Sequence, residues 1–250
     1  MKLTIIGCSG SYPGPEGPAS CYLLEAEGHR ILLDLGSGAL GTLQRHASIY
    51  EIDAVLLTHL HADHCLDLCG YHVARTYGPD APYPRIPVYA PADAPRRLAA
   101  AYGMPEEPGL ETAFSFVRLA PGTFQVGPFE ITAALVNHPI EAYGFRVTHK
   151  GVTIVYSGDT GLAPALVKLA EGADLLLCEA SFEDGPDLPV DLHLTGEQAA
   201  RHAAEAGVGK LVLTHLVPWN DPAAILADAL RGGYEGPIEL ARSGAVYDFS

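Results

Sequence analysis

Short apolar runs, separated by glycine, proline, asparagine and aspartate, recur along the whole chain. Runs of this kind, bounded by turn-forming residues, are typical of buried β-strands. They predict strands at residues 3–7, 21–26, 29–34, 54–58, 87–90, 129–136, 144–149, 153–157, 175–179, 210–214, 238–241 and 245–248.

Apolar positions at helical spacing predict helices at residues 38–46, 63–77, 94–101, 164–170, 195–206 and 221–230. Asp63 is a candidate cap, Thr195 begins a sequence that resembles a capping box, and Pro222 follows Asp221 at a first helical turn. Because strands precede helices in two successive halves, we expect one domain over residues 1–250, with two sheets packed together and helices outside.

Two stretches rich in proline, glycine and glutamate interrupt the pattern, at residues 77–91 and 103–114. Neither resembles a linker between domains, so both are expected to be surface excursions. The length of the second also makes it a candidate lid over a site.

The composition, 48% hydrophobic and 18% charged, is that of a globular protein. Thirty acidic against 15 basic residues give a net charge of −15, and Arg96-Arg97 is the densest basic spot. A large nucleic acid would therefore meet a repulsive average field. The charge favours a small substrate.

Nothing in the chain predicts a membrane span, because no apolar run approaches the roughly 18–20 residues required. The opening residues, MKLTIIGCSGS, are expected to form a strand and a turn rather than a signal peptide. The five cysteines are odd in number and scattered, which favours free buried thiols in a cytoplasmic protein over a disulfide framework.

The sequence THLHADH follows one apolar run and contains His59, His61, Asp63 and His64. At an extended strand end, residues i and i+2 point the same way, so His59 and His61 can bind one cation together. The turn into a helix directs Asp63 and His64 toward a neighbouring position. Imidazole and carboxylate are ligands for first-row divalent metals, whereas the simpler interpretation is a solvated histidine-rich loop.

Three further residues of the same kind stand where apolar runs stop: His138, Asp159 and His215. Each would be unremarkable alone. Strand ends can meet at one rim of a sheet, where open sheets build their sites. Thr-His ends two such runs, at residues 58–59 and 214–215.

Together these residues resemble the metal-binding signature of the metallo-β-lactamase superfamily, over essentially the whole chain. The resemblance implies an α/β fold, an αββα four-layer sandwich, and two divalent metal ions, with Zn²⁺ first and Mn²⁺ or Fe as alternatives. It assigns His59, His61 and His138 to one metal, Asp63, His64 and His215 to the other, and Asp159 to the bridge. It also implies that the two Thr-His strand ends are equivalent in related halves.

The sequences CEASF, at residues 178–182, and DLHLTG, at residues 191–196, resemble elements of ribonuclease Z-like phosphodiesterases. By this resemblance Glu179 orients His193, and His193 serves the leaving oxygen. Only residues 139–158 separate His138 from Asp159, which leaves no room for the tRNA-grasping arm of full ribonuclease Z. The arm-less members include cyclic-nucleotide phosphodiesterases. They imply hydrolysis of a small phosphodiester through a metal-bridged hydroxide, with Asp63 at the reacting water, in a homodimer.

Alternatives stay open at this point. The same site would serve tRNA 3′ processing, thioester or lactone hydrolysis, or a catalytically idle metal-binding module. Without the resemblance, Glu179 would be interpreted as a salt-bridge residue, and His193 as a polar residue at the start of a helix. Ser9 and Trp219 are weak candidates for substrate contacts, through loop N–H groups and base stacking, and each has a purely structural alternative. Asp34 is as plausible a turn former as a partner of the ligands.

Overall fold

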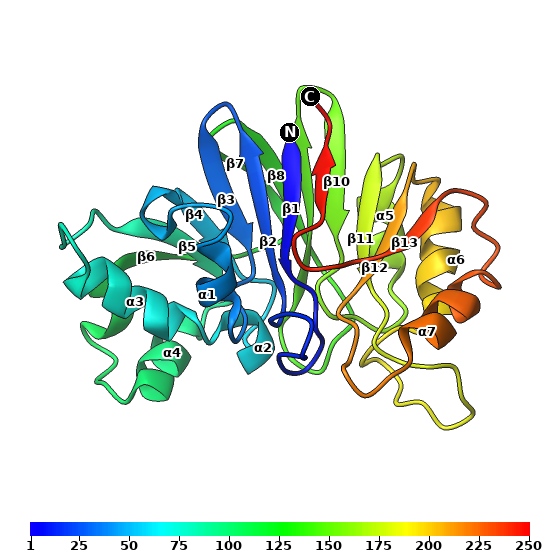
Figure 1. Ribbon diagram of the computed structural model, residues 1–250, viewed down its shortest axis with the longest axis horizontal. Helices are drawn as coiled ribbons and strands as arrows, with labels where there is room; N and C mark the ends of the chain where they lie inside the picture. Colours follow the sequence, from blue (N-terminus) through cyan, green and yellow to red (C-terminus); the bar gives the residue numbers. More distant parts are fainter.

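The computed structural model describes residues 1–250 and contains two seven-stranded mixed sheets that pack face to face (Figure 1). The first sheet runs in the order β14 (Val246–Asp248), β1 (Lys2–Gly7), β2 (Cys21–Ala26), β3 (His29–Leu33), β4 (Ala54–Leu56), β5 (Ile86–Ala90) and β6 (Phe114–Arg118). The second runs in the order β13 (Ile238–Leu240), β12 (Leu211–Thr214), β11 (Leu175–Glu179), β10 (Val152–Tyr156), β9 (Tyr143–His149), β8 (Phe129–Leu135) and β7 (Gly122–Val126).

Helices cover the outer face of each sheet (Figure 1). Beside the first sheet lie α1 (Ala39–Leu43), α2 (Ala62–Cys65), α3 (Leu68–Tyr77) and α4 (Ala94–Tyr102), with the short 3₁₀ helices η1 (Ile49–Glu51) and η2 (Gly109–Thr112). Beside the second lie α5 (Pro164–Ala170), α6 (Gly196–Ala206) and α7 (Pro222–Ala229).

The alternation of side chains along the strands explains the layers. In β2, Tyr22 and Leu24 enter the core between the sheets, whereas Cys21 and Leu23 enter the core beneath α1–α4. A strand whose two faces are both covered must be apolar at every position, which is why β2 reads as a continuous apolar run. A third core, rich in alanine, lies between the second sheet and α5–α7. The predicted αββα sandwich is confirmed.

The carboxyl ends of the parallel strands meet at one edge of the sandwich. Each sheet is antiparallel on one side and parallel on the other, with β3–β6 parallel in the first sheet and β10–β13 parallel in the second. Strands can be counted from the antiparallel edge of each sheet, which is β14 in the first and β7 in the second. Counted in this way, β4 and β11 are each fifth, and β5 and β12 are each sixth. The two Thr-His sequences follow β4 and β12, so the expected equivalence of these strand ends is wrong, although both reach the same edge.

The structure differs from the sequence predictions at two strands and one helix. The short edge strands β6 and β7 were not expected, and the single helix predicted at residues 63–77 is divided into α2 and α3. Asp63 lies inside α2, where His61 is the residue at the N-cap. The capping box at Thr195 and the Asp221 cap followed by Pro222 are confirmed.

Residues 103–114 pack on the body of the protein. Leu110, in η2, is buried in the core beneath α4 together with Ala113 and Phe114. This burial argues against the lid considered from the sequence. All five cysteines are free, as expected, but only Cys21, Cys65 and Cys178 are buried. The helices are all too short or too polar for a membrane-crossing segment.

Candidate metal centre

Two groups of imidazole and carboxylate side chains meet at the edge where β4, β8, β10 and β12 end. In the first group, the ligand atoms of His59, His61, His138 and Asp159 lie within 4.8 Å of one another. His61 Nδ1 is 3.1 Å from His59 Nε2 and 3.3 Å from His138 Nε2. The extended backbone of His61 at the start of α2 turns its ring back toward His59. The strand-end prediction of a shared His59–His61 position therefore agrees with the geometry.

The second group contains Asp63, His64, His215 and again Asp159. His64 Nε2 is 3.2 Å from His215 Nε2, and His215 Nε2 is 3.0 Å from Asp63 Oδ2. Asp159 belongs to both groups, with Oδ1 3.2 Å from His64 Nε2 and Oδ2 3.6 Å from His59 Nε2. All seven side chains predicted from the sequence are thus brought to one place, and the shared carboxylate lies where the resemblance puts the bridge.

The donor set fits divalent cations. Nitrogen atoms of separate imidazoles face one another at about hydrogen-bond distance, an arrangement that lone pairs tolerate only with a cation or a proton between them. Asp159 Oδ1 is buried and accepts no hydrogen bond of good geometry. A buried carboxylate oxygen ordinarily has a donor. These groups are suited to holding metal ions of the zinc, manganese or iron type.

The charges of the site follow from burial and from this crowding. Burial lowers the pKa of His59, His61 and His138, so these rings are neutral and keep a lone pair for a metal. Burial by itself raises the pKa of Asp159, but the neighbouring His215 and other imidazoles hold that pKa well below its usual value. The shared carboxylate is therefore an anion.

Hydrogen bonds donated by Nδ1 fix the orientation of three of the rings. The Nδ1 of His138 donates to the Leu192 carbonyl at 2.9 Å, and that of His64 donates to Asp34 Oδ2 at 2.8 Å. His59 Nδ1 lies 3.0 Å from Thr58 Oγ1. Each contact places the proton on Nδ1 and leaves Nε2 free as a ligand atom.

Asp34 accepts several of the hydrogen bonds that hold these rings and their neighbours in place. It is fully buried, and its carboxylate accepts hydrogen bonds from the Thr58 N–H at 2.7 Å, the Thr58 hydroxyl, the Tyr156 hydroxyl at 2.8 Å and His64. Its backbone also has a φ of 59°, in the left-handed region. The two interpretations left open by the sequence both hold, because Asp34 forms the turn and orients His64.

Ser181 supports His215 and was missed from the sequence. Its hydroxyl donates to Glu179 Oε2 at 2.8 Å and accepts from His215 Nδ1 at 2.6 Å. The signal was present, because Ser181 follows Glu179 by two residues at the end of β11, so both side chains point to the same side.

Glu179 and His193 form an ionic pair beside the candidate metal ligands. Glu179 is fully buried and Oε1 accepts from His193 Nδ1 at 2.9 Å and from the Thr160 N–H at 2.7 Å. His193 Nδ1 lies 4.0 Å from Asp159 Oδ2. Burial lowers the pKa of His193, but Glu179 outweighs burial and raises that pKa to about 9. His193 is thereby held as an imidazolium at the edge of the site.

A cleft of about 430 Å³ opens beside His193. Its walls include Ser11, Phe182, Leu192, Trp219 and Asn220. The predicted substrate contact Trp219 lies in this cleft, whereas Ser9 is not among the lining residues. The Ser9 hydroxyl donates to the Gly17 carbonyl and accepts from the Gly14 N–H, so it holds its own loop together.

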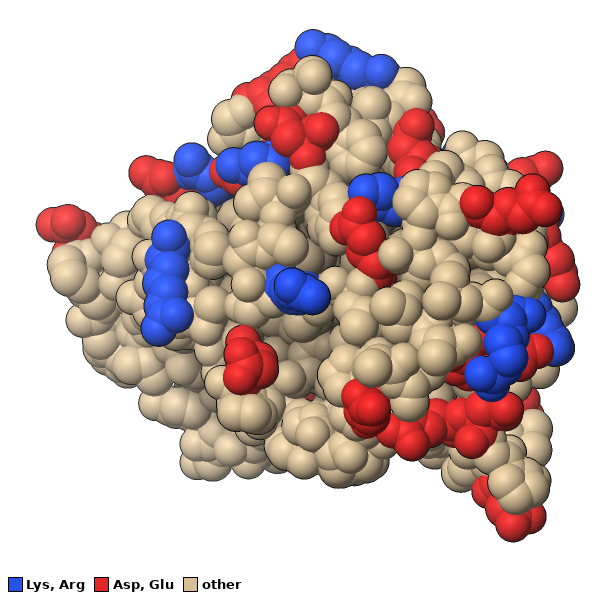
Figure 2. Space-filling view, turned by 45° about the vertical axis from the view of Figure 1, so that its right-hand side comes forward, with Lys and Arg blue, Asp and Glu red and all other residues tan.

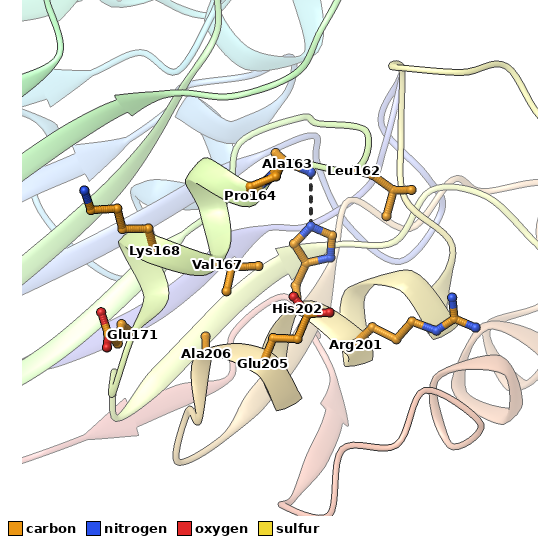
Figure 3. A pocket seen from close by; sticks show the side chains of 10 residues that line it. All are labelled: Leu162, Ala163, Pro164, Val167, Lys168, Glu171, Arg201, His202, Glu205 and Ala206. Carbon is orange, nitrogen blue, oxygen red and sulfur yellow. Dashed lines mark hydrogen bonds between the residues drawn. The ribbon is translucent and has the colours of Figure 1, made fainter.

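A larger cleft, of about 520 Å³, lies away from the metal ligands between α5 and α6 (Figure 3). His202 reaches across it, and Nε2 accepts from the Ala163 N–H at 3.1 Å (dashed line in Figure 3). Its Nδ1 donates to the Gln198 carbonyl at 2.8 Å. Both ring nitrogens are used in joining α6 to the start of α5, so this histidine is a structural link.

Fold and site together define the class of the protein. A sequence model described as "Beta-lactamase superfamily domain" matches residues 29–216. The chain belongs to this superfamily and is a hydrolase of the metallo-β-lactamase fold.

Particular relatives extend over nearly its whole length. An uncharacterized protein of Mycobacterium leprae is 44% identical, over 99% of this chain and 88% of the relative. A ribonuclease Z of Myxococcus xanthus is 30% identical, over 98% of this chain and 96% of the relative. The crystal structure of the metallo-β-lactamase fold protein YhfI from Bacillus subtilis is similar with a TM-score of 0.87 and 30% identity, covering 98% of each chain.

Proposed function

We propose that this hydrolase is a phosphodiesterase that cleaves a small phosphodiester, most specifically a cyclic nucleotide, with the seven side chains of the two groups as metal ligands. The observation that carries the proposal is the Glu179–His193 pair, in which a buried carboxylate holds an imidazole, a group able to donate a proton, beside the candidate metal centre. The relationship to ribonuclease Z supports phosphodiester chemistry.

Bound divalent cations would neutralise the phosphoryl oxygens, polarise phosphorus for attack and make a water reactive at neutral pH. Asp63 is placed to accept a hydrogen bond from this water. Its Oδ2 accepts a hydrogen bond from the Ser11 N–H at 2.9 Å and lies 3.0 Å from His215 Nε2. Oδ1 is therefore the free acceptor.

His193 completes the reaction at the other end of the scissile bond. Because Nδ1 donates to Glu179, Nε2 carries the proton that passes to the departing alkoxide as the phosphorus–oxygen bond breaks. The negative charge of Glu179 keeps the imidazolium charged before the transfer and attracts the next proton afterwards. A leaving group as basic as a sugar hydroxyl needs this donor, whereas nitrophenolate departs without it.

A small substrate is favoured over RNA on two grounds. The net charge is −15, and the face of the molecule in Figure 2 carries scattered lysines and arginines among acidic residues, without a broad basic patch. Between His138 and Asp159 the chain is occupied by β9 and β10, so this segment holds no RNA-grasping arm.

A substrate panel tests the proposal. Protein loaded with Zn²⁺ or Mn²⁺ is offered bis(p-nitrophenyl) phosphate, cyclic AMP, a precursor tRNA, a thioester and a β-lactam. We expect turnover of the first two. Cleavage of the thioester or the lactam without any phosphodiesterase activity would overturn the proposal, and trimming of the tRNA without cyclic AMP turnover would replace it with ribonuclease Z activity. The ions' identity, a homodimer and a cytoplasmic location stay predictions.

A further inference from the structure

Trp219 lines the cleft beside His193, Tyr12 lies against Trp219, and the proposed reaction uses neither ring. Trp219 is the sole tryptophan of the chain and is 69% exposed, and Tyr12 is 43% exposed. Their ring centroids are 5.6 Å apart, with an angle of 35° between the planes. An indole left largely in water forgoes the stabilisation that burial gives a large apolar side chain. Exposed aromatic surface beside a reactive site therefore points to contact with a ligand.

The fold fixes the position of both rings. Tyr12 lies in the loop after β1, and Trp219 in the loop after β12. The two loops are joined by backbone hydrogen bonds, from the Gly10 N–H to the Leu216 carbonyl at 3.0 Å and from the Leu216 N–H to the Cys8 carbonyl at 2.9 Å. The rings are thus presented at a set separation, so that little ordering is required when a ligand binds.

The same cleft extends from Trp219 toward the candidate metal centre. Trp219, His193 and Ser11 all line it. Ser11 donates its N–H to Asp63 Oδ2 at 2.9 Å, so one residue of the cleft wall is hydrogen-bonded to a proposed ligand. The volume of about 430 Å³ lies in the range of roughly 300–1,000 Å³ that small-molecule sites occupy.

We propose that Tyr12 and Trp219 form a subsite for the nucleobase of the substrate and thereby select nucleotides over other phosphodiesters. The proposal rests on the proposed function for the position of the phosphate. A planar base offers a π-face to an aromatic side chain whatever its identity, and stacking needs no positive charge from the protein. This suits an acidic chain whose phosphate affinity would come from cations. Since Trp219 lines the same cleft as His193, which serves the leaving oxygen, the base belongs to the leaving-group side of the substrate.

Trp219 provides its own reporter, because tryptophan emission arises from this residue alone. The metal-loaded protein is titrated with AMP and, as a base-free probe, with ribose 5-phosphate. We expect AMP to change the emission saturably and ribose 5-phosphate to leave it unchanged. Tyr12→Ala should raise the dissociation constant for AMP about tenfold, in line with stacking on one ring. Tyr77→Ala removes an exposed tyrosine on α3 as the matched control and should have no effect.

Kinetics separate base recognition from catalysis. Trp219→Ala and Tyr12→Ala should each raise KM for cyclic AMP about tenfold with little change in kcat, and Trp219→Phe should restore most of the loss. Hydrolysis of a cyclic ribose phosphate without a base should be unaffected. Equal losses on both substrates, or no loss on either, would overturn the subsite.

The two proposals fail in different ways. If the wild-type protein cleaves no phosphodiester but AMP still changes the emission in a Tyr12-dependent manner, the subsite stands and the proposed reaction falls. If cyclic AMP is cleaved but the emission does not respond to AMP, the reaction stands and the subsite is refuted.

Discussion

Replacing His193 by glutamine should remove a pH-dependent part of the folding stability. The glutamine side chain can still donate a neutral hydrogen bond to Glu179, so the change mainly removes the titratable charge. His193 is mostly buried, with 13% of its side chain exposed, and its partner Glu179 is completely buried. Solvent therefore screens this pair only weakly.

The magnitude follows from the raised pKa. Folding shifts the pKa of His193 from 6.5 to about 9, and each unit corresponds to about 1.4 kcal/mol, which gives roughly 3 kcal/mol. Because the pKa is raised in the folded state, this stabilisation is complete below about pH 6.5 and is lost as the pH rises through about 9.

The assay is urea unfolding of wild type and His193→Gln across this pH range. Both proteins are metal-free, because bound cations would repel the imidazolium. The free energies of unfolding should differ by roughly 3 kcal/mol at the acid end and converge toward the alkaline end. His46→Gln, which replaces an exposed histidine, is the matched control. Parallel curves for wild type and His193→Gln, with a constant difference, would refute the reasoning.

Three further substitutions test other parts of the site. Asp159→Ala should abolish binding of the metal pair and turnover together, as measured by metal counting and a nitrophenyl phosphodiester assay; full activity would contradict the bridging role. Ser181→Ala leaves the Nδ1 proton of His215 without its acceptor and should weaken metal affinity about 10- to 100-fold in a chelator competition, and unchanged affinity would argue against this support. Gly10→Ala puts a methyl group 2.5 Å from the His215 carbonyl oxygen and should lower both melting temperature and activity, whereas Gly41→Ala meets no atom within 4 Å and serves as its control.

The meeting of the candidate metal ligands was predictable, because His59, His138, Asp159 and His215 stand just after apolar runs. The other three, His61, Asp63 and His64, follow His59 in the same turn. A polar strand end that is followed by a turn marks the edge of a sheet. The carboxyl ends of parallel strands lie at the same edge. The pairing of Glu179 with His193 came from the resemblance, and the structure brings the two side chains into contact. Assignment of these residues to metals and to catalysis remains a prediction.

Other features depended on contacts that local patterns do not encode. The edge strands β6 and β7 bury few side chains, so their apolar periodicity is weak. The predicted helix at residues 63–77 is divided because Asp67 binds elsewhere, with its N–H on the Leu35 carbonyl and its carboxylate on the Leu40 N–H. The contact of Ser181 with Glu179 had a local signal, but its contact with His215 required knowing that β11 and β12 are neighbours.

The most direct test of the account is a crystal structure of the protein grown with Zn²⁺ or Mn²⁺, in which anomalous scattering locates the metals. Two peaks about 3.5–4 Å apart are expected. One should lie among His59, His61 and His138, the other among Asp63, His64 and His215, with Asp159 touching both. Peaks confined to the surface, with these imidazoles turned away from one another, would contradict the shared metal centre and the hydrolysis derived from it.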